Sequence, residues 1–247
     1  MSDVVLPQPV TVETVERARA GYAGWRARRL ASVVEPTGNL SLIETRWFAP
    51  GDTTTPEKAR TGSPDSVTAT ELTRQNLETG EVERGIRLWD ANSPAIQAFE
   101  TVTAFPFNPD WVLGGTFEPV SDNRTVPFEH LRDHGLTREK VVPGDITLIL
   151  DGARYVLSAF DDNGRLLLTF GDPTNRATGE SATYGAGRFL FVALEGTQVV
   201  LDFNRAFVPP CGFSDHFNCP LPPPNNQLRT PITAGEKKVI FRDVSGY

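Results

Sequence analysis

The sequence has little cysteine, and it has no long apolar run. Two cysteines in 247 residues exclude a scaffold held together by disulfides. No run of about 18 apolar residues occurs, so we expect no transmembrane helix. Acidic residues outnumber basic ones by 31 to 24, and the net charge of −7 argues against binding to nucleic acid or to an anionic membrane. We therefore expect neither of these partners.

The N-terminal segment lacks the features of a secretion signal. It has no basic start, no apolar stretch of sufficient length and no cleavage site of small residues. We expect a cytoplasmic protein with reduced thiols. The sequence gives no indication of oligomeric state.

One helix is readable near the N-terminus. Apolar residues recur there at spacings of three and four, which places them on one face of a helix. Acidic residues stand near the start of this segment and arginines near its end, an order that complements the helix dipole. The pattern predicts a helix near Val12–Leu30, whose apolar face consists of Val15, Ala18, Tyr22 and Trp25.

Most of the remaining chain predicts short strands separated by turn residues. Three of them, Ile146–Leu150, Ala153–Phe160 and Leu166–Phe170, predict a meander with a turn at Asp151-Gly152 and a second connection at Asp161-Asp162-Asn163-Gly164. Two more, Arg188–Leu194 and Thr197–Phe203, predict a hairpin around Glu195-Gly196. Other strands are expected at Leu40–Phe48, Gly85–Trp89, Trp111–Pro119 and Lys238–Arg242.

Strands that outnumber helices, without alternation of the two, predict a mainly β fold. We expect an antiparallel sandwich or barrel with one N-terminal α-helix. Residues 1–35 would form the helix packed on the domain, and residues 36–247 a single β-rich domain. A proline-rich strap at 209–226 would cross the mouth or the edge of that domain.

The last third of the chain carries several rare segments in a distinctive order. They resemble an uncharacterised bacterial and archaeal family, domain of unknown function 1684. Because this family has no established activity, the resemblance implies no reaction. His216 and Asn225 stand where the family pattern has Tyr and Glu, which speaks against either as a family-wide catalyst. The matching segments are Phe170–Thr174, Thr183–Leu190, Leu201–Ala206, Pro209–Cys211, Cys219–Pro224 and Ala234–Lys237, with weaker likeness at Trp25-Arg26, Leu40–Leu42, Arg84–Asp90 and Phe105–Trp111.

A charged residue, Asp202, stands at the end of the apolar run Val199–Leu201. A carboxylate that is buried in such a strand needs a partner. Arg188 begins the neighbouring predicted strand, so both residues should lie near the far end of one hairpin. We predict an Arg188–Asp202 ion pair, to which Asn204 and Tyr184 add hydrogen bonds. These four residues are the candidate ligand-binding set, and Asp202 is the candidate catalytic residue.

Two thiols and an imidazole occur within nine residues. Cys211, His216 and Cys219 supply three residue types that bind zinc, but their spacing is not that of a zinc finger or ribbon. We prefer two buried structural thiols that lie close in space, and we expect no metal and no cofactor. A local disulfide remains an alternative, and so does Cys211 as a catalytic nucleophile.

Two further patterns are interpreted as structural. His130 and His134 lack the glutamate of a metalloprotease helix, since position 131 is Leu, and we expect both on the surface. Gly185-Ala186-Gly187 precedes a predicted strand rather than a helix, which argues against a phosphate loop. It predicts a tight turn that requires positive φ.

Three hypotheses about function remain open at this point. The first is a β domain that binds a small molecule in a polar pocket near Asp202. The second is a hydrolase or lyase in which Asp202 acts as general base and Arg188 holds an anionic substrate. The third is a structural or interaction domain in which the same residues only stabilise the fold.

Overall fold

The computed structural model describes residues 9–120, 124–196 and 198–242, and within them the fold is mainly β, as predicted. Contacts divide the chain into two compact units. The barrel unit comprises residues 9–25, 102–209 and 219–238, and the sheet unit comprises residues 26–101, 210–218 and 239–242. Whether residues 36–247 act as one domain stays a prediction. None of the described helices combines the length and the apolar character needed to span a bilayer.

The predicted N-terminal helix is α1, Val12–Val33. The hydroxyl of Thr11 accepts a hydrogen bond from the backbone of Thr14 at its start. Within the barrel unit, the Tyr22 ring contacts Phe107 at 5.4 Å between centroids, and the Tyr22 hydroxyl donates to the carbonyl of Phe105. The apolar face that the spacing predicts is therefore the face that packs.

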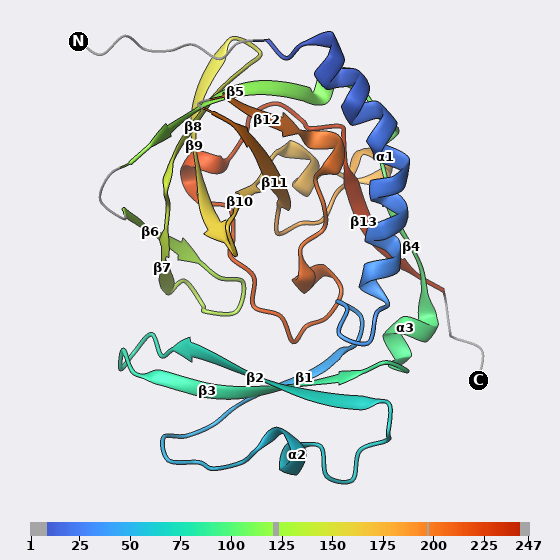
Figure 1. Cartoon of the computed structure of the whole chain (residues 1–247), viewed down its shortest axis with the longest axis vertical. Coiled ribbons are helices and arrows are strands. Elements are labelled where there is room, and N and C mark those ends of the chain that lie inside the picture. Colours follow the sequence, from blue (N-terminus) through green and yellow to red (C-terminus); the bar gives the residue numbers. More distant parts are fainter. Residues whose placement is uncertain (1–8, 121–123, 197, 243–247) are drawn as a thin grey trace. The chain divides into compact units, whose positions relative to one another are not determined.

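Six antiparallel strands form a closed barrel in the order β10-β11-β12-β5-β8-β9 (Figure 1). The predicted meander is confirmed as β8–β9–β10, and the predicted hairpin as β11–β12. Thr197 lies outside the described residues. The bounds are β5 Val112–Pro119, β8 Gly144–Leu150, β9 Ala153–Asp162, β10 Arg165–Phe170, β11 Arg188–Glu195 and β12 Gln198–Asp202.

Both turns of the meander have the backbone that their residues favour. Asp151 and Gly152 have φ of 49° and 74°, and Asn163 and Gly164 have φ of 54° and 80°. Asp-Gly and Asn-Gly adopt such a pair of positive φ values more easily than other dipeptides, and the resulting turn matches the twist of the flanking strands. The two turns thus fix the register of β8, β9 and β10.

Apolar side chains fill the inside of the barrel. Every second residue of each strand points inward, as the period of a strand requires. A six-stranded barrel has little room beyond its own side chains. The core residues that the strands contribute include Phe117, Ile146, Leu148, Leu150, Tyr155, Leu157, Leu168, Phe170, Leu190, Val192, Val199 and Leu201.

The segment 219–236 comes after the last barrel strand in sequence and contributes Leu228, Ile232 and Ala234 to the same core. Asn226 is fully buried and inserts its amide where β9 and β10 separate. It accepts a hydrogen bond from the Ser158 backbone N–H and donates to the carbonyls of Ser158 and Thr169. One side chain thereby replaces missing ladder hydrogen bonds.

The turn predicted at Gly185–Gly187 is confirmed. Gly187 has φ of 90°, and a Cβ at this position would lie 2.5 Å from Pro222. Glycine is therefore required here for its conformation and for the close approach of the proline-rich segment.

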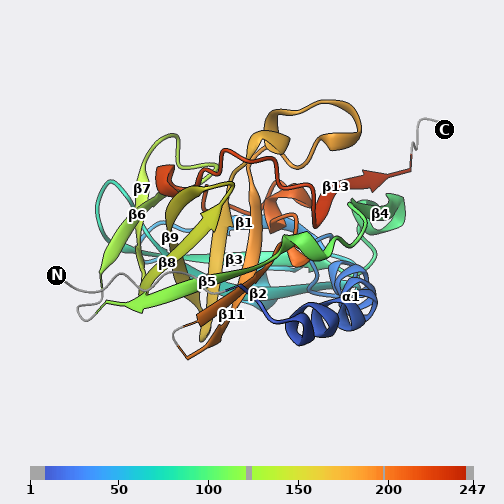
Figure 2. The ribbon, with the colours of Figure 1, turned by 90° about the horizontal axis from the view of Figure 1, so that it is seen from above.

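A hairpin that the sequence did not predict lies beside the barrel strands, formed by β6, Thr125–Glu129, and β7, Thr137–Val141 (Figure 2). Its loop corrects the prediction of two surface histidines, because His130 is buried, while His134 is exposed as predicted. A second pair joins β4, Phe99–Ala104, to β13, Glu236–Phe241. The 3-10 helices are Pro109–Trp111, Pro173–Arg176, Gly179–Ser181, Phe203–Arg205, Pro210–Gly212 and Pro224–Asn226.

The sheet unit contains a three-stranded antiparallel sheet in the order β1-β3-β2. The strands are β1 Leu42–Trp47, β2 Val67–Gln75 and β3 Val82–Asp90. A core of Ala59, Val67, Ile86 and Leu88 lies on one face. The segment 51–66 contains the short helix α2, Pro56–Ala59, and α3 spans Pro94–Ala98.

Candidate functional site

The predicted Arg188–Asp202 ion pair is wrong, because the two side chains lie on opposite faces of the barrel wall. Arg188 is two residues from Leu190, whose side chain is in the core, so it points inward. Asp202 follows the inward Leu201 and points outward. The β11–β12 hairpin itself is as predicted. The prediction of the ion pair failed because it placed both side chains on the same face of the barrel wall.

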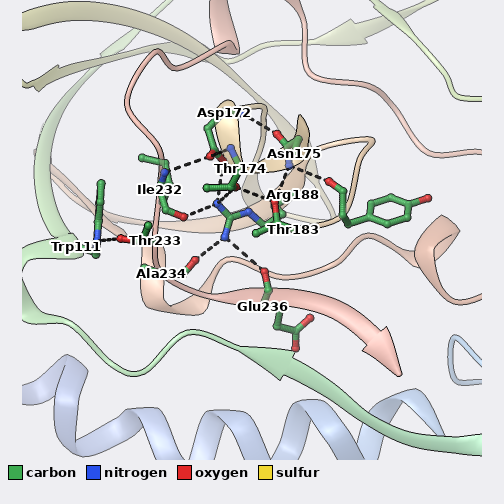
Figure 3. A network of polar contacts seen from close by, with 11 residues as sticks. Trp111, Asp172, Thr174, Asn175, Thr183, Arg188, Ile232, Thr233, Ala234 and Glu236 are labelled. Carbon is green, nitrogen blue, oxygen red and sulfur yellow. Dashed lines mark hydrogen bonds and ion pairs between the residues drawn. The ribbon is translucent and has the colours of Figure 1, made fainter. Parts of the chain in front are cut away.

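Arg188 is completely buried and donates hydrogen bonds from both terminal nitrogens (Figure 3). Its Nη2 lies 2.8 Å from Asp172 Oδ2 and 2.8 Å from the Ile232 carbonyl oxygen. Its Nη1 donates to the carbonyls of Ala234 and Glu236. Arg188 therefore joins the start of β11 to the segment 232–236.

Asp172 is the actual partner of Arg188, and it is equally well held. Its Oδ1 accepts from the backbone N–H of Thr174 at 2.9 Å and from that of Ile232 at 3.1 Å. Neither side chain of the ion pair is exposed. Burial lowers the pKa of Arg188 from its ordinary value, and Asp172 opposes that shift. A guanidinium stays charged even so, and this pair fixes the fold at the end of the barrel.

Tyr184 belongs to this network through its backbone, because its carbonyl accepts a hydrogen bond from Asn175 at 2.8 Å. The four residues predicted to form one site thus divide between two clusters. Tyr184 and Arg188 belong to the one around Asp172. Asp202 and Asn204 belong to the other, which we call the Asp202 cluster and which consists of Asn108, Asp202, Asn204 and Arg205.

The Asp202 cluster is built on the turn that ends β12. Asp202 Oδ1 accepts from the backbone N–H of Asn204 at 3.2 Å and from its Nδ2 at 3.0 Å, so the predicted contact with Asn204 is confirmed. Asn204 also exchanges two hydrogen bonds with the backbone of Asn108, at 2.8 and 2.9 Å. The turn and the loop before Trp111 are thereby held together.

The second carboxylate oxygen of Asp202, Oδ2, has an ion-pair partner but no hydrogen bond. Asp202 Oδ2 lies 3.1 Å from Arg205 Nε, but within the described residues neither atom makes a hydrogen bond, although both are buried. Burial raises the pKa of Asp202, while Asn204 and Arg205 lower it by smaller amounts. A buried carboxylate oxygen without a donor is unusual in a folded protein.

Helix α1 supplies the other boundary of the Asp202 cluster. A Cβ at Gly21 would lie 2.8 Å from Arg205 Nη2, so the guanidinium passes directly over this glycine. In the same helix, the rings of Tyr22 and Trp25 stack at 6.0 Å between centroids. Arg205 thus lies against α1 at Gly21, outside the barrel.

The cysteines and His216 are placed separately. Cys211 and Cys219 are both buried thiols, as predicted, and they belong to different units. Their proximity in space stays a prediction. His216 is exposed, and its carbonyl accepts from the Thr45 hydroxyl. Within the described part of the chain, no three side chains of His, Cys, Asp or Glu converge in a way that would hold a metal ion.

Sequence reasoning did not assign Asp172 as the partner of Arg188, or Arg205 as the partner of Asp202. Asp172-Pro173-Thr174 has the pattern of a capping residue before a proline, and its side chain caps the 3-10 helix Pro173–Arg176. Arg205 is three residues after Asp202, the spacing at which side chains meet across a single turn. Both signals are local, and both were present in the sequence.

Comparison with known proteins agrees with the fold and names no activity. The chain is similar to an uncharacterized protein from Haloarcula marismortui solved by solution NMR, at 22% identity and a TM-score of 0.55, covering 92% of this chain and 98% of that one. At this identity the likeness supports the fold alone. No curated protein matches the chain. The model of the family described as "Protein of unknown function (DUF1684)" matches residues 97–237. Since this is more than half of the sequence, the chain belongs to that family.

Proposed function

We propose that this protein binds a small polar molecule at the Asp202 cluster, on the outer face of the barrel beside α1. The observation that carries the proposal is the buried Asp202 Oδ2, which accepts no hydrogen bond from the described residues. Nearly all buried polar atoms in proteins have a partner. A ligand that donates to Oδ2 and accepts from Arg205 Nε would satisfy both atoms at once.

The chemistry of the site favours a molecule that carries both a donor and an acceptor. A hydroxyl or ammonium group is the natural partner for the carboxylate, and a carbonyl or carboxylate oxygen for the guanidinium. The Tyr22 and Trp25 rings belong to α1, the helix that Arg205 meets at Gly21, and they suit an apolar or cyclic part of the ligand. Amino acids, sugars and small hydroxy acids have this combination.

One observation favours the hydrolase or lyase hypothesis as a second candidate. Burial raises the pKa of Asp202, as is common for carboxylates that transfer protons. In this version Arg205 takes the role that the sequence analysis gave to Arg188, because it is the cation 3.1 Å from Asp202. The purely structural hypothesis describes the Arg188 network better than the Asp202 cluster.

The test is a thermal-shift screen of wild-type protein and of Asp202→Asn against amino acids, sugars and hydroxy acids. We expect at least one compound to raise the melting temperature of the wild type by a few degrees, and to have no effect on Asp202→Asn. The matched control is Asp145→Asn, since Asp145 pairs with Arg124 elsewhere on the barrel. Asp145→Asn should respond like the wild type.

Two outcomes contradict the proposal. Either no compound in the panel stabilises the wild type, or the compounds that do stabilise it act equally on Asp202→Asn. For any compound that passes, product analysis after prolonged incubation separates binding from turnover. Turnover that Asp202→Asn lacks would favour the hydrolase or lyase.

A further inference from the structure

The loop between β6 and β7 buries a histidine at the place where the hairpin meets the segment 219–221. The side chain of His130 is 6% exposed. His130 bridges Pro220 in antiparallel fashion, and backbone hydrogen bonds flank this bridge on both sides. Leu131 N–H donates to the Cys219 carbonyl at 2.9 Å, and Leu221 N–H donates to the Glu129 carbonyl at 2.7 Å. The imidazole therefore lies at the junction of two segments distant in sequence.

The position of His130 Nδ1 identifies the tautomer of the neutral ring. It lies 3.1 Å from the carbonyl oxygen of Phe128, which can only accept, so Nδ1 carries a proton and the neutral ring needs none on Nε2. A second proton would create a cation in a buried site. The fold is thus built around the neutral form.

The charged groups around His130 offer little compensation for such a cation. Asp133 Oδ2 is 4.0 Å from Nδ1, but both oxygens of Asp133 already accept hydrogen bonds from Arg138, at 2.7 and 3.0 Å. Lys140 lies over the Phe160 ring and adds another positive charge, which Asp162 on β9 partly offsets. The segment 219–221 contributes no charged side chain.

Burial is the largest cause that lowers the pKa of His130 below its ordinary value of 6.5. Lys140 and Arg138 lower it further, while Asp133 and the Phe128 carbonyl raise it. When the folded pKa lies below the unfolded one, the unfolded or opened state binds more protons between the two values. Stability from this residue is complete above 6.5 and decreases as the pH falls.

We propose that His130 is an acid-sensitive latch, which holds the β6–β7 hairpin to segment 219–221 when neutral and releases it when protonated. The opened state exposes the imidazole and breaks the hydrogen bonds to Cys219 and Glu129. The barrel strands do not depend on these contacts, so release is local. Opening is reversible and requires no ligand, because the proton itself binds the opened state more tightly.

Hydrogen exchange measured by mass spectrometry at about pH 7.5 and about pH 5 tests this, after correction for the intrinsic pH dependence of exchange. We expect the hydrogen-exchange protection of residues 125–141 to fall as the pH is lowered from 6.5 to the pKa of His130 in the folded protein. The fall should be about tenfold for each pH unit, relative to β8 and β9 in the same sample. His130→Asn keeps a donor for the Phe128 carbonyl and cannot take up a proton. Its hairpin should show no pH dependence beyond that of the barrel.

His134 provides a matched control, because it is exposed and lies in the same loop. His134→Gln should lose hairpin protection in acid as the wild type does. The latch is refuted if the wild-type hairpin keeps its protection at about pH 5, or if His130→Asn loses as much as the wild type. Should His130→Asn fail to fold, an NMR titration of the wild type decides the matter. There, His130 must titrate below 6.5, and a midpoint at or above 6.5 overturns the proposal.

Discussion

Two arginine–aspartate pairs lie near the ends of neighbouring barrel strands, and they differ in almost every physical respect. Arg188 and Asp172 point into the barrel end, with no exposure of either side chain. Arg205 and Asp202 lie outside, with side-chain exposures of 36% and 12%. Among the described residues, the inner pair leaves Arg188 Nε without a hydrogen bond, although both terminal nitrogens of Arg188 and both oxygens of Asp172 are bonded. The outer pair leaves the carboxylate oxygen Asp202 Oδ2 and the guanidinium nitrogen Arg205 Nε without one.

The difference separates a structural role from a candidate binding role. A buried charge is tolerated where it is paired and well hydrogen-bonded, and the inner pair meets that condition at every polar side-chain atom except Arg188 Nε. Neither of its side chains is exposed, so a ligand would gain little from it. The outer pair keeps hydrogen-bonding capacity, and its guanidinium lies against helix α1 at Gly21. Charge alone does not mark a functional residue, but incomplete hydrogen bonding near a surface does.

The largest expected effect comes from removing the inner carboxylate charge. In Asp172→Asn the side chain keeps an acceptor for the N–H groups of Thr174 and Ile232, but it leaves Arg188 buried without a counter-ion. We expect a loss of about 3–5 kcal/mol in the free energy of unfolding. Urea denaturation at neutral pH, followed by tryptophan fluorescence, measures it.

The control for this variant is Asp145→Asn. Asp145 accepts two hydrogen bonds from Arg124, and the two side chains are 25% and 38% exposed. For such a pair we expect a loss of about 1 kcal/mol or less. Equal losses in the two variants would contradict the distinction between the inner pair and the exposed pair.

A smaller effect is expected from Asp202→Asn. Asparagine still caps the turn at Asn204, and the pair with Arg205 is partly exposed, so stability should change by about 1 kcal/mol or less at neutral pH. The pH dependence should change more clearly. Because burial raises the pKa of Asp202, its contribution is complete below 3.8 and decreases as the pH rises through the folded value.

Denaturation curves of the wild type and of Asp202→Asn across the acid range measure this contribution. The wild type should lose stability relative to the variant as the pH rises above 3.8. A large loss of stability in Asp202→Asn at neutral pH would instead place the outer pair in the same structural class as the inner one.

The sequence was sufficient for the parts of the fold that depend on local signals. Helix α1 followed from the spacing of Ala18, Tyr22 and Trp25, and the meander from Asp151-Gly152 and Asn163-Gly164. It was insufficient for β6 and β7, where Arg138 and Lys140 alternate along a strand whose polar side chains pack against other charged or aromatic groups. Burial of His130 depends on Pro220, ninety residues away in sequence, and no local pattern carries that information.

The site was predicted in part, and the error has a simple geometric origin. Asp202 was recognised as an unusual charge after an apolar run, and its contact with Asn204 was expected. The hairpin that brings Arg188 near it is also real. But side chains alternate between the two faces of a strand, so a pairing argument must establish that both residues share a face. Leu190 and Leu201 mark the inward face, and Arg188 matches that face while Asp202 does not.

The smallest expected effect tests whether α1 fixes the outer pair. Gly21 and Gly24 both lie in this helix, and replacing a glycine by alanine in an exposed helix stabilises it by about 1 kcal/mol. Gly24 is exposed, so Gly24→Ala should show that gain in full.

At Gly21 the new methyl group would meet Arg205 Nη2 at 2.8 Å. The guanidinium is the end of a flexible side chain and can shift, so Gly21→Ala should fold normally. The shift draws Arg205 away from Asp202, and the lost attraction offsets part of the gain. We therefore expect Gly21→Ala to be less stabilising than Gly24→Ala in parallel urea denaturations, and to weaken any ligand that binds the Asp202 cluster. If the two variants are equally stabilised and bind equally, α1 does not position Arg205, and the outer pair is no better organised than an ordinary surface ion pair.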